Sequence, residues 1–86
     1  MGEMAATKEQ LTSAADLAIA GDWEAAHKAT QTLSGDATAD WLHAVLHKIE
    51  GDHDNSRYWY ERTEHEFEEF GDPKAELAAI RAGLAE

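Results

Sequence analysis

Apolar residues recur along this chain with the spacing of an α-helix. They fall three and four residues apart in five separate segments, which places them on one face of a helix in each segment. Strand signals are weak, because alternating patterns and β-branched runs are absent. The pattern therefore predicts an all-α fold of about five short helices, over residues 8–20, 22–34, 38–50, 54–70 and 73–85. The predicted core positions, in helix order, are Leu11, Ala15, Ala18 and Ile19; Trp23, Ala26, Thr30 and Leu33; Leu42, Val45, Leu46 and Ile49; Trp59, Thr63, Phe67 and Phe70; and Leu77, Ile80 and Leu84.

Gly-Asp pairs separate the predicted helices. Glycine takes the left-handed conformation that ends a helix, and aspartate accepts hydrogen bonds from the free N–H groups at the start of the next one. Pro73 suits a first helical position, and Thr7 with Gln10 predicts a capping box. Because the connections are short, we expect sequential helices to run antiparallel. The four pairs are Gly21-Asp22, Gly35-Asp36, Gly51-Asp52 and Gly71-Asp72.

One of these turns carries a family resemblance. "GDWEAA" at residues 21–26 is followed thirty residues later by "GDHDNS" at residues 51–56. "GDWEAA" resembles the turn and second-helix start of a tetratricopeptide repeat, and "EGDHDNSRYWYERT" resembles a degenerate copy, although the repeat of that family is about 34 residues long. The resemblance implies two helical hairpins, at about 8–34 and 38–70, and a capping helix at about 73–85. It also implies binding to a protein partner without catalysis.

The centre of the chain is also similar to short bacterial proteins that carry an HAxLHxxEGDxxNxxYWY core. This similarity implies no chemistry.

Length and composition limit what the chain can be. Eighty-six residues predict a single domain, residues 1–86, and an apolar share of 43 % is enough for a folded core. The absence of cysteine excludes disulfides and thiolate zinc sites, and it fits a reducing cytoplasm. No apolar run is long enough for a membrane helix. The first ten residues lack the basic and apolar regions of a signal peptide. We therefore expect a cytoplasmic protein.

A net charge of −11 narrows the range of partners. Nucleic acid and anionic membranes are disfavoured, because both are bound through Lys and Arg, whereas a basic protein or a cation would be attracted. Glu61, Glu64 and Glu68 form a stripe in the C-terminal half of helix 54–70, where the helix dipole favours cations. Arg57 with Glu61 is the one favourable pair predicted there. The stripe serves either solubility or a basic partner or cation.

Helix 38–50 carries the candidate chemistry. On a helical wheel, Asp40, His43, His47 and Glu50 cluster nearly opposite the aliphatic face, so we expect them to point outward. His43 and His47 are four residues apart, a spacing that suits two ligands of one divalent metal such as zinc. Asp40 or Glu50, or His53 beyond the helix end, could supply a third ligand. The glutamate of the helical zinc-protease motif is absent, so this metal site is the alternative reading.

The favoured function is a small interaction module that binds a protein partner or a second copy of itself. The predicted binding face is the outward side of helix 38–50 with adjacent aromatic residues, where titrating histidines would couple binding to pH. Tyr58 points away from the core, whereas Tyr60 should bury its ring and keep its hydroxyl paired. No phosphate loop, nucleophile elbow or positioned triad is present, so we expect no catalysis and no cofactor other than the alternative metal. The predicted binding residues are Trp41, His43, His47, Glu50, Arg57 and Tyr58.

Overall fold

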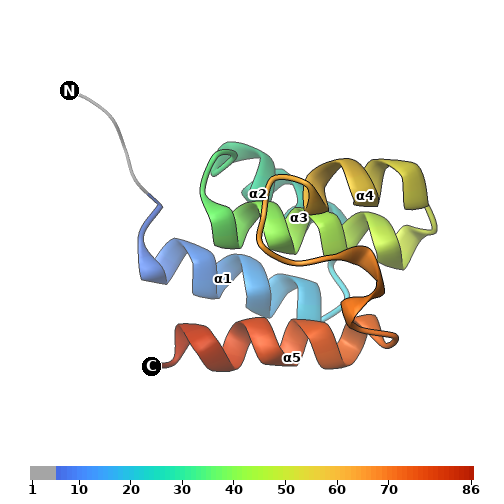
Figure 1. Cartoon of the computed structure of the whole chain (residues 1–86). Helices are drawn as coiled ribbons and strands as arrows, with labels where there is room; N and C mark the ends of the chain where they lie inside the picture. The colour runs from blue at the N-terminus through green and yellow to red at the C-terminus, as the bar shows by residue number, and fades with distance from the viewer. Residues whose placement is uncertain (1–5) are drawn as a thin grey trace.

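The computed structural model describes residues 6–86 and contains five α-helices (Figure 1). Their bounds are α1 Lys8–Ile19, α2 Trp23–Thr32, α3 Ala37–Glu50, α4 His53–Tyr60 and α5 Pro73–Leu84, and a short 3₁₀ helix, η1, spans Phe67–Glu69. No strand occurs within residues 6–86, so the predicted all-α fold with about five helices is confirmed. The predictions of one domain over residues 1–86 and of no signal peptide include residues 1–5, which lie outside the described part of the chain.

The helix starts follow the predicted capping. The Gln10 N–H donates to Thr7 Oγ1 at 3.1 Å, and the Thr7 N–H donates to Gln10 Oε1 at 3.0 Å, which completes the capping box. Pro73 is the first residue of α5. These contacts satisfy N–H groups that a helix start otherwise leaves unpaired. Each aspartate of the four Gly-Asp pairs accepts a backbone N–H from the first turn of the next helix: Asp22, Asp36, Asp52 and Asp72.

Three of the four glycines adopt the predicted turn conformation. Gly21, Gly35 and Gly51 have φ angles of 88°, 102° and 89° and follow α1, α2 and α3. Residues that carry a side chain rarely adopt this left-handed backbone conformation, whereas glycine adopts it at little cost. Gly71 has no positive φ and follows η1. The prediction that Gly71 ends a long helix is therefore wrong.

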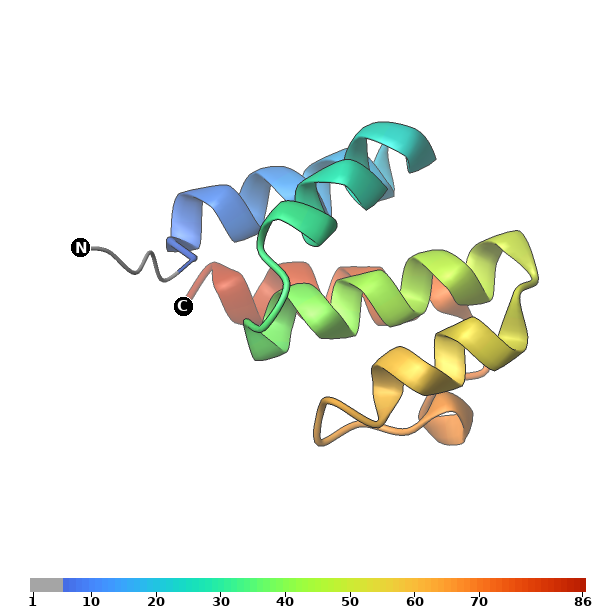
Figure 2. The ribbon, with the colours of Figure 1, turned by 90° about the horizontal axis from the view of Figure 1, so that it is seen from above.

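Helix α3 lies at the centre of the molecule and contacts each of the other four α-helices. Figure 2 shows α2 and α4 flanking α3, while α1 and α5 lie side by side and both contact it (Figure 1). The chain reverses direction between α1 and α2, and again between α3 and α4 (Figure 2). Because helices surround α3, it buries much more than the single face that a surface helix buries.

The core combines the aliphatic side of α3 with small residues of α1. Leu42, Val45 and Leu46 are fully buried and belong to one cluster with residues of α1, α2, α4 and α5. Ile19 and Ile49 were predicted as core residues, but they are 51 % and 44 % exposed. Each lies at the C-terminal end of its helix. The apolar spacing of the sequence continues to this end, but no neighbouring helix in the described part of the chain buries the side chain there.

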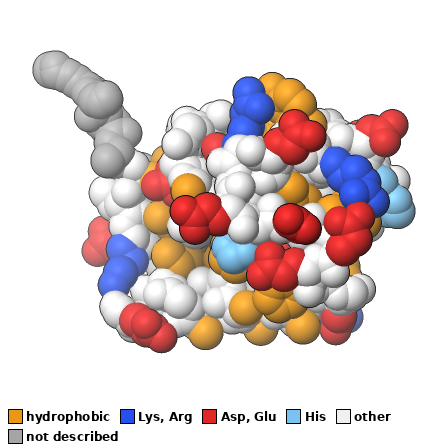
Figure 3. Space-filling model, viewed as in Figure 1, with side chains coloured by type: hydrophobic (Ala, Val, Ile, Leu, Met, Phe, Trp, Pro, Cys, Tyr) orange, Lys and Arg blue, Asp and Glu red, His pale blue; other side chains and the backbone are white. Residues whose placement is uncertain are grey.

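The described surface is strongly acidic. Figure 3 shows Asp and Glu side chains spread over one face, with few Lys and Arg among them.

No helix within residues 6–86 is long and apolar enough to cross a membrane.

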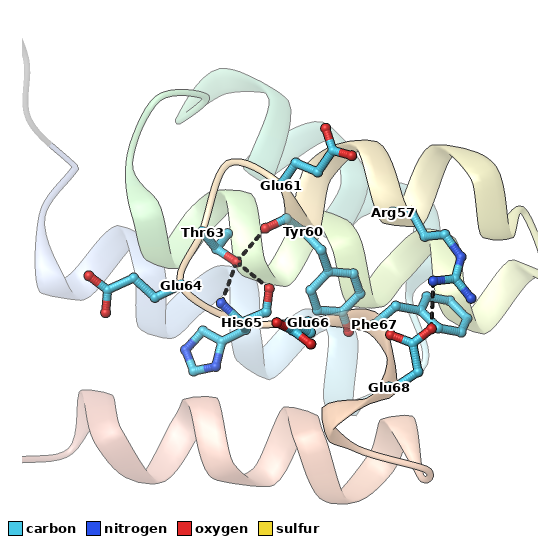
Figure 4. A pocket seen from close by; sticks show the side chains of 9 residues that line it. All are labelled: Arg57, Tyr60, Glu61, Thr63, Glu64, His65, Glu66, Phe67 and Glu68. Carbon is cyan, nitrogen blue, oxygen red and sulfur yellow. Dashed lines mark hydrogen bonds and ion pairs between the residues drawn. The ribbon is translucent and has the colours of Figure 1, made fainter.

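The segment after Tyr60 departs from the predicted helix 54–70. Helix α4 ends at Tyr60, and the chain continues as a loop to η1. Thr63 Oγ1 donates to the Tyr60 carbonyl at 2.8 Å and accepts the His65 N–H at 2.9 Å (Figure 4), so its side chain competes with helical hydrogen bonding. The many glutamates of this segment are also unfavourable near a helix C-terminus.

Arg57 shows the consequence of the early helix end. Its Nη1 atom lies 2.6 Å from Glu68 Oε2, so the predicted pairing of Arg57 with Glu61 is wrong (Figure 4). The Arg57 guanidinium also lies 4.1 Å from the centroid of the Phe67 ring. The segment after Tyr60 therefore folds back, so that Phe67 and Glu68 contact Arg57 of α4.

Candidate metal centre

The histidines of α3 are buried, although they were predicted to point outward. His43 and His47 are only 3 % and 5 % exposed. Two tryptophans cover this side of α3: Trp59 of α4 stacks on His43 with ring centroids 4.0 Å apart, and Trp23 of α2 meets His47 edge-on at 5.9 Å. The prediction that these histidines point outward is therefore wrong, because α2 and α4 pack against this side of α3.

A third histidine completes the cluster from a different helix. His27 of α2 places its Nε2 atom 3.2 Å from Nε2 of His43. The ring centroid of His27 is 4.8 Å from that of His43 and 5.1 Å from that of His47, and the two α3 rings are 4.9 Å apart. One ring nitrogen from each histidine lies within 4.8 Å of those of the other two. We call His27, His43 and His47 the histidine cluster.

Sequence reasoning missed His27. Its spacing of four residues from Trp23 is the one available signal, since it places both side chains on one side of α2. Trp23 and His27 indeed stack, with centroids 4.6 Å apart. Nothing in the sequence, however, specifies how α2 crosses α3, and this crossing is what brings His27 to the other two rings.

The other predicted ligands take different positions. Asp40 is buried and accepts the Gly35 N–H at 3.2 Å, and burial raises the pKa of its carboxyl group. His53 is exposed, with its ring against Phe67. Glu50 is exposed but contacts the cluster directly, because its Oε2 lies 2.7 Å from Nδ1 of His47. The residue that joins His43 and His47 in a group of three potential ligands is thus His27, and Glu50 belongs to a second such group with His47 and Asp52.

The surroundings disfavour the protonated form of two of the three histidines, His43 and His27. Burial, together with the smaller effects of the neighbouring His27 and His47, lowers the pKa of His43 to about 4. Burial and His47 also lower the pKa of His27, while Glu50 acts in the opposite direction. Neutral imidazoles carry the free lone pairs that metal ions require.

One ring nitrogen of the cluster lacks a hydrogen bond. Nδ1 of His43 is buried and has no partner among the described residues. Leaving a buried polar atom unpaired costs about 1–3 kcal/mol, so such atoms in folded proteins usually indicate a water or an ion. The internal hydrogen bonds therefore do not fully account for this cluster.

The remaining predicted binding residues are divided between surface and interior. Glu50, Arg57 and Tyr58 are exposed, and Tyr58 is 48 % exposed, as predicted for a residue that points away from the core. Trp41 is half-buried, stacks on His65 at a centroid distance of 3.5 Å and donates its Nε1–H to Glu76 at 2.8 Å. The six residues therefore do not form one continuous outward face.

A second buried polar cluster was also missed. Glu76 of α5 is completely buried. Its Oε1 accepts from Lys48 Nζ at 2.8 Å, and its Oε2 accepts from Trp41 Nε1 at 2.8 Å and from the Tyr60 hydroxyl at 2.6 Å. This confirms the predicted burial of Tyr60 with a paired hydroxyl, and burial together with Glu76 raises its pKa. We call Trp41, Lys48, Tyr60 and Glu76 the Glu76 network.

The tetratricopeptide resemblance rests on the Gly-Asp turns and on the chain reversals that follow two of them. These are the turns between α1 and α2 and between α3 and α4, and the resemblance itself stays a prediction. In comparisons with protein-family models, with curated proteins and with solved structures, nothing matches this chain.

Proposed function

We propose that this chain binds a divalent transition-metal ion of the zinc class through the histidine cluster. The observation that carries the proposal is the convergence of three imidazole rings from two helices, and the surroundings lower the pKa of two of them, His43 and His27. Imidazole suits Zn²⁺, Cu²⁺ and Ni²⁺ better than it suits Ca²⁺ or Mg²⁺. The site joins α2 to α3, so the ion would link the first pair of helices to the second.

The distances within the cluster fit this use. Ligands about 2.0–2.1 Å from a tetrahedral zinc ion lie about 3.3 Å from one another. The His27 and His43 Nε2 atoms are already 3.2 Å apart, and the cluster nitrogens lie within 4.8 Å of one another. Small side-chain rotations would therefore bring all three to one ion.

Glu50 supports the site from outside it. A ligating histidine usually donates its second ring N–H to a carboxylate or carbonyl group, which fixes the tautomer. Glu50 lies against Nδ1 of His47, so Nε2 of His47 is left for the ion. Glu50 thereby takes the role of a supporting residue.

Zinc titration of protein made without a histidine tag tests the proposal. We expect one tightly bound ion per chain by competition with a chelating dye, and at least a tenfold loss of affinity in His27→Gln. His53→Gln is the matched control, because this exposed histidine lies outside the cluster. Circular dichroism would establish that both variants are folded. Unchanged affinity in His27→Gln would exclude the proposed site.

Binding of a protein partner, or of a second copy of the chain, is a second candidate function. The supporting observation is Tyr58, which is 48 % exposed and has the Arg62 guanidinium 4.3 Å from its ring centroid. Tyrosine and arginine are enriched among the residues that dominate binding energy in interfaces, and the tetratricopeptide resemblance favours the same use. Sedimentation of the wild type and of Tyr58→Ala tests self-association, and only loss of a dimer in the variant would support it. Absence of catalysis and a cytoplasmic location stay predictions.

A further inference from the structure

The surroundings of the histidine cluster offer few further ligands. Indole rings cover two of its rings, since Trp23 stacks on His27 and Trp59 stacks on His43. Trp23 Nε1–H is committed to the Leu46 carbonyl at 2.7 Å, and an indole N–H is a donor only. These neighbours supply no lone pair to an ion.

The two buried hydroxyl groups near these helices are committed as well. Thr30 Oγ1 donates to the His27 carbonyl at 2.9 Å, and Ser56 Oγ donates to the Ala44 carbonyl at 2.7 Å. Both hydrogen bonds are directed to backbone carbonyls of α2 and α3. The cluster therefore offers three ring nitrogens that lie within 4.8 Å of one another, one from each histidine.

Glu50 is the carboxylate closest to the cluster, and its position separates it from the ion. It lies 2.7 Å from Nδ1 of His47. In an imidazole ring, Nδ1 and Nε2 point in different directions, so a metal on Nε2 lies on the other side of the ring from this carboxylate. Glu50 would have to break its contact with His47 in order to coordinate the ion.

Solvent can reach the site from its rim. His27 is only half-buried, and Glu50 is exposed. Coordinating imidazoles carry no negative charge, so three of them leave the double positive charge of the ion uncompensated, which favours an anionic ligand. Zinc sites with three protein ligands keep a fourth position for water or for a molecule from solution.

Resting on the metal binding proposed above, we infer that the ion held by His27, His43 and His47 keeps one coordination position for a small exogenous ligand, either water or a monodentate anion. The protein would supply three ligands from α2 and α3, and Glu50 would orient His47. The site would then belong to the exchangeable class of metal centres instead of the closed, purely structural class.

Cobalt substitution and azide titration test this inference. Tetrahedral Co²⁺ absorbs strongly in the visible region, and that spectrum changes when a coordinated water is replaced by an anion. We expect the spectrum in the wild type and in the control His53→Gln, and we expect azide to shift it with saturation at one azide per cobalt. A tetrahedral spectrum that azide does not change would overturn the inference while leaving metal binding intact. Absence of any tetrahedral spectrum would overturn the metal site itself.

Glu50→Gln separates the open position from a carboxylate ligand. If the fourth position is open, azide shifts the spectrum of the wild type and of Glu50→Gln alike. The variant then differs only in cobalt affinity, which should fall about 10- to 100-fold. An azide response that occurs in Glu50→Gln but not in the wild type would identify Glu50 as the fourth ligand and overturn the inference.

Discussion

Two buried polar clusters lie on opposite sides of α3, and they differ in how completely their atoms are paired. In the Glu76 network, both carboxylate oxygens accept hydrogen bonds from buried or half-buried donors. In the histidine cluster, Nδ1 of His43 has no partner among the described residues. The Glu76 network also holds a charge pair, whereas in the histidine cluster the pKa values of His43 and His27 are lowered, which favours their neutral forms.

This difference separates a fully paired cluster from one that leaves a buried nitrogen, Nδ1 of His43, without a partner among the described residues. A buried polar network stabilises one conformation when every member is paired, and a partly paired network is costly. The Glu76 network connects α3, α4 and α5 and needs nothing further. The histidine cluster connects α2 to α3 and keeps a free nitrogen. The first should therefore affect stability in all conditions, and the second should respond to protons and metal ions.

The largest effect is expected from removal of the Glu76 carboxylate. Glu76→Ala leaves the Lys48 ammonium buried without a counter-charge, and breaking a buried pair in this way costs about 3–5 kcal/mol. A chain of 86 residues has a free energy of unfolding of roughly 4–13 kcal/mol, so the loss is a large share of the stability and the urea midpoint should fall markedly. Urea denaturation followed by circular dichroism measures this.

Glu61→Ala is the control for this comparison, because Glu61 is exposed and makes no side-chain hydrogen bond or ion pair in the described structure. Its stability should match that of the wild type. A stable Glu76→Ala would show that the paired network is dispensable, and the contrast between the two clusters would fail.

A smaller effect is expected from acid, and it should arise at the histidine cluster. His43 has a pKa of about 4 in the folded chain, against an ordinary value of 6.5. Between these values the unfolded chain binds a proton that the folded chain does not, so stability is complete above pH 6.5 and falls as the pH decreases towards 4. At about 1.4 kcal/mol per unit the loss is about 3 kcal/mol, and the lowered pKa of His27 acts in the same direction.

Urea denaturation at several pH values between 7.5 and 4.5 measures this loss. His43→Gln should flatten the dependence, because it removes the titrating group, whereas the control His53→Gln should retain it. Equal slopes in the two variants would mean that the acid sensitivity arises outside the histidine cluster.

The sequence predicted local structure well where one side chain determines it. The aspartate caps, the Thr7–Gln10 capping box and the left-handed Gly21, Gly35 and Gly51 all follow from interactions within a few residues. The end of α4 was missed because Thr63 competes with the helix, and apolar spacing through Phe67 and Phe70 does not reveal that competition.

The candidate site could be predicted only in part. The pairing of His43 with His47 follows from helical spacing, but the wheel assumed one buried face, and α3 is covered by four helices. His27 and Glu76 reach α3 from helices whose crossing is set by tertiary packing. Two of the three histidines could therefore be predicted as candidate ligands, whereas the contacts that join them to other helices could not.

The third effect in order of size is expected from Glu50→Gln, which tests whether Glu50 orients His47 in the histidine cluster. Loss of a carboxylate that orients a ligating histidine typically weakens metal binding about 10- to 100-fold. Zinc affinity, measured by competition with a chelating dye, should fall by this factor without a change in stoichiometry. Asp54→Asn is the matched control, because this nearby exposed carboxylate belongs to neither group of potential ligands. An unchanged affinity in Glu50→Gln would remove Glu50 from the site.

The smallest effects are expected at the exposed ion pair of Arg57 with Glu68, which is the surface counterpart of Lys48 with Glu76. The two pairs have nitrogen–oxygen distances of 2.6 Å and 2.8 Å, but the side chains of Arg57 and Glu68 are 49 % and 65 % exposed, and that of Glu76 is fully buried. Solvent and salt screen exposed pairs, so Glu68→Gln should leave the urea midpoint unchanged in low and in high salt.

Arg57→Ala should cost slightly more than Glu68→Gln, because it also removes the contact of the guanidinium with the Phe67 ring, worth about 0.5–1 kcal/mol. Measuring both variants beside Glu76→Ala compares two ion pairs of similar length that differ in burial. If burial and complete pairing give the Glu76 network its importance, the two surface variants must stay far closer to the wild type than Glu76→Ala does. Comparable losses at both sites would instead mean that burial and complete pairing do not distinguish the Glu76 network from an exposed ion pair.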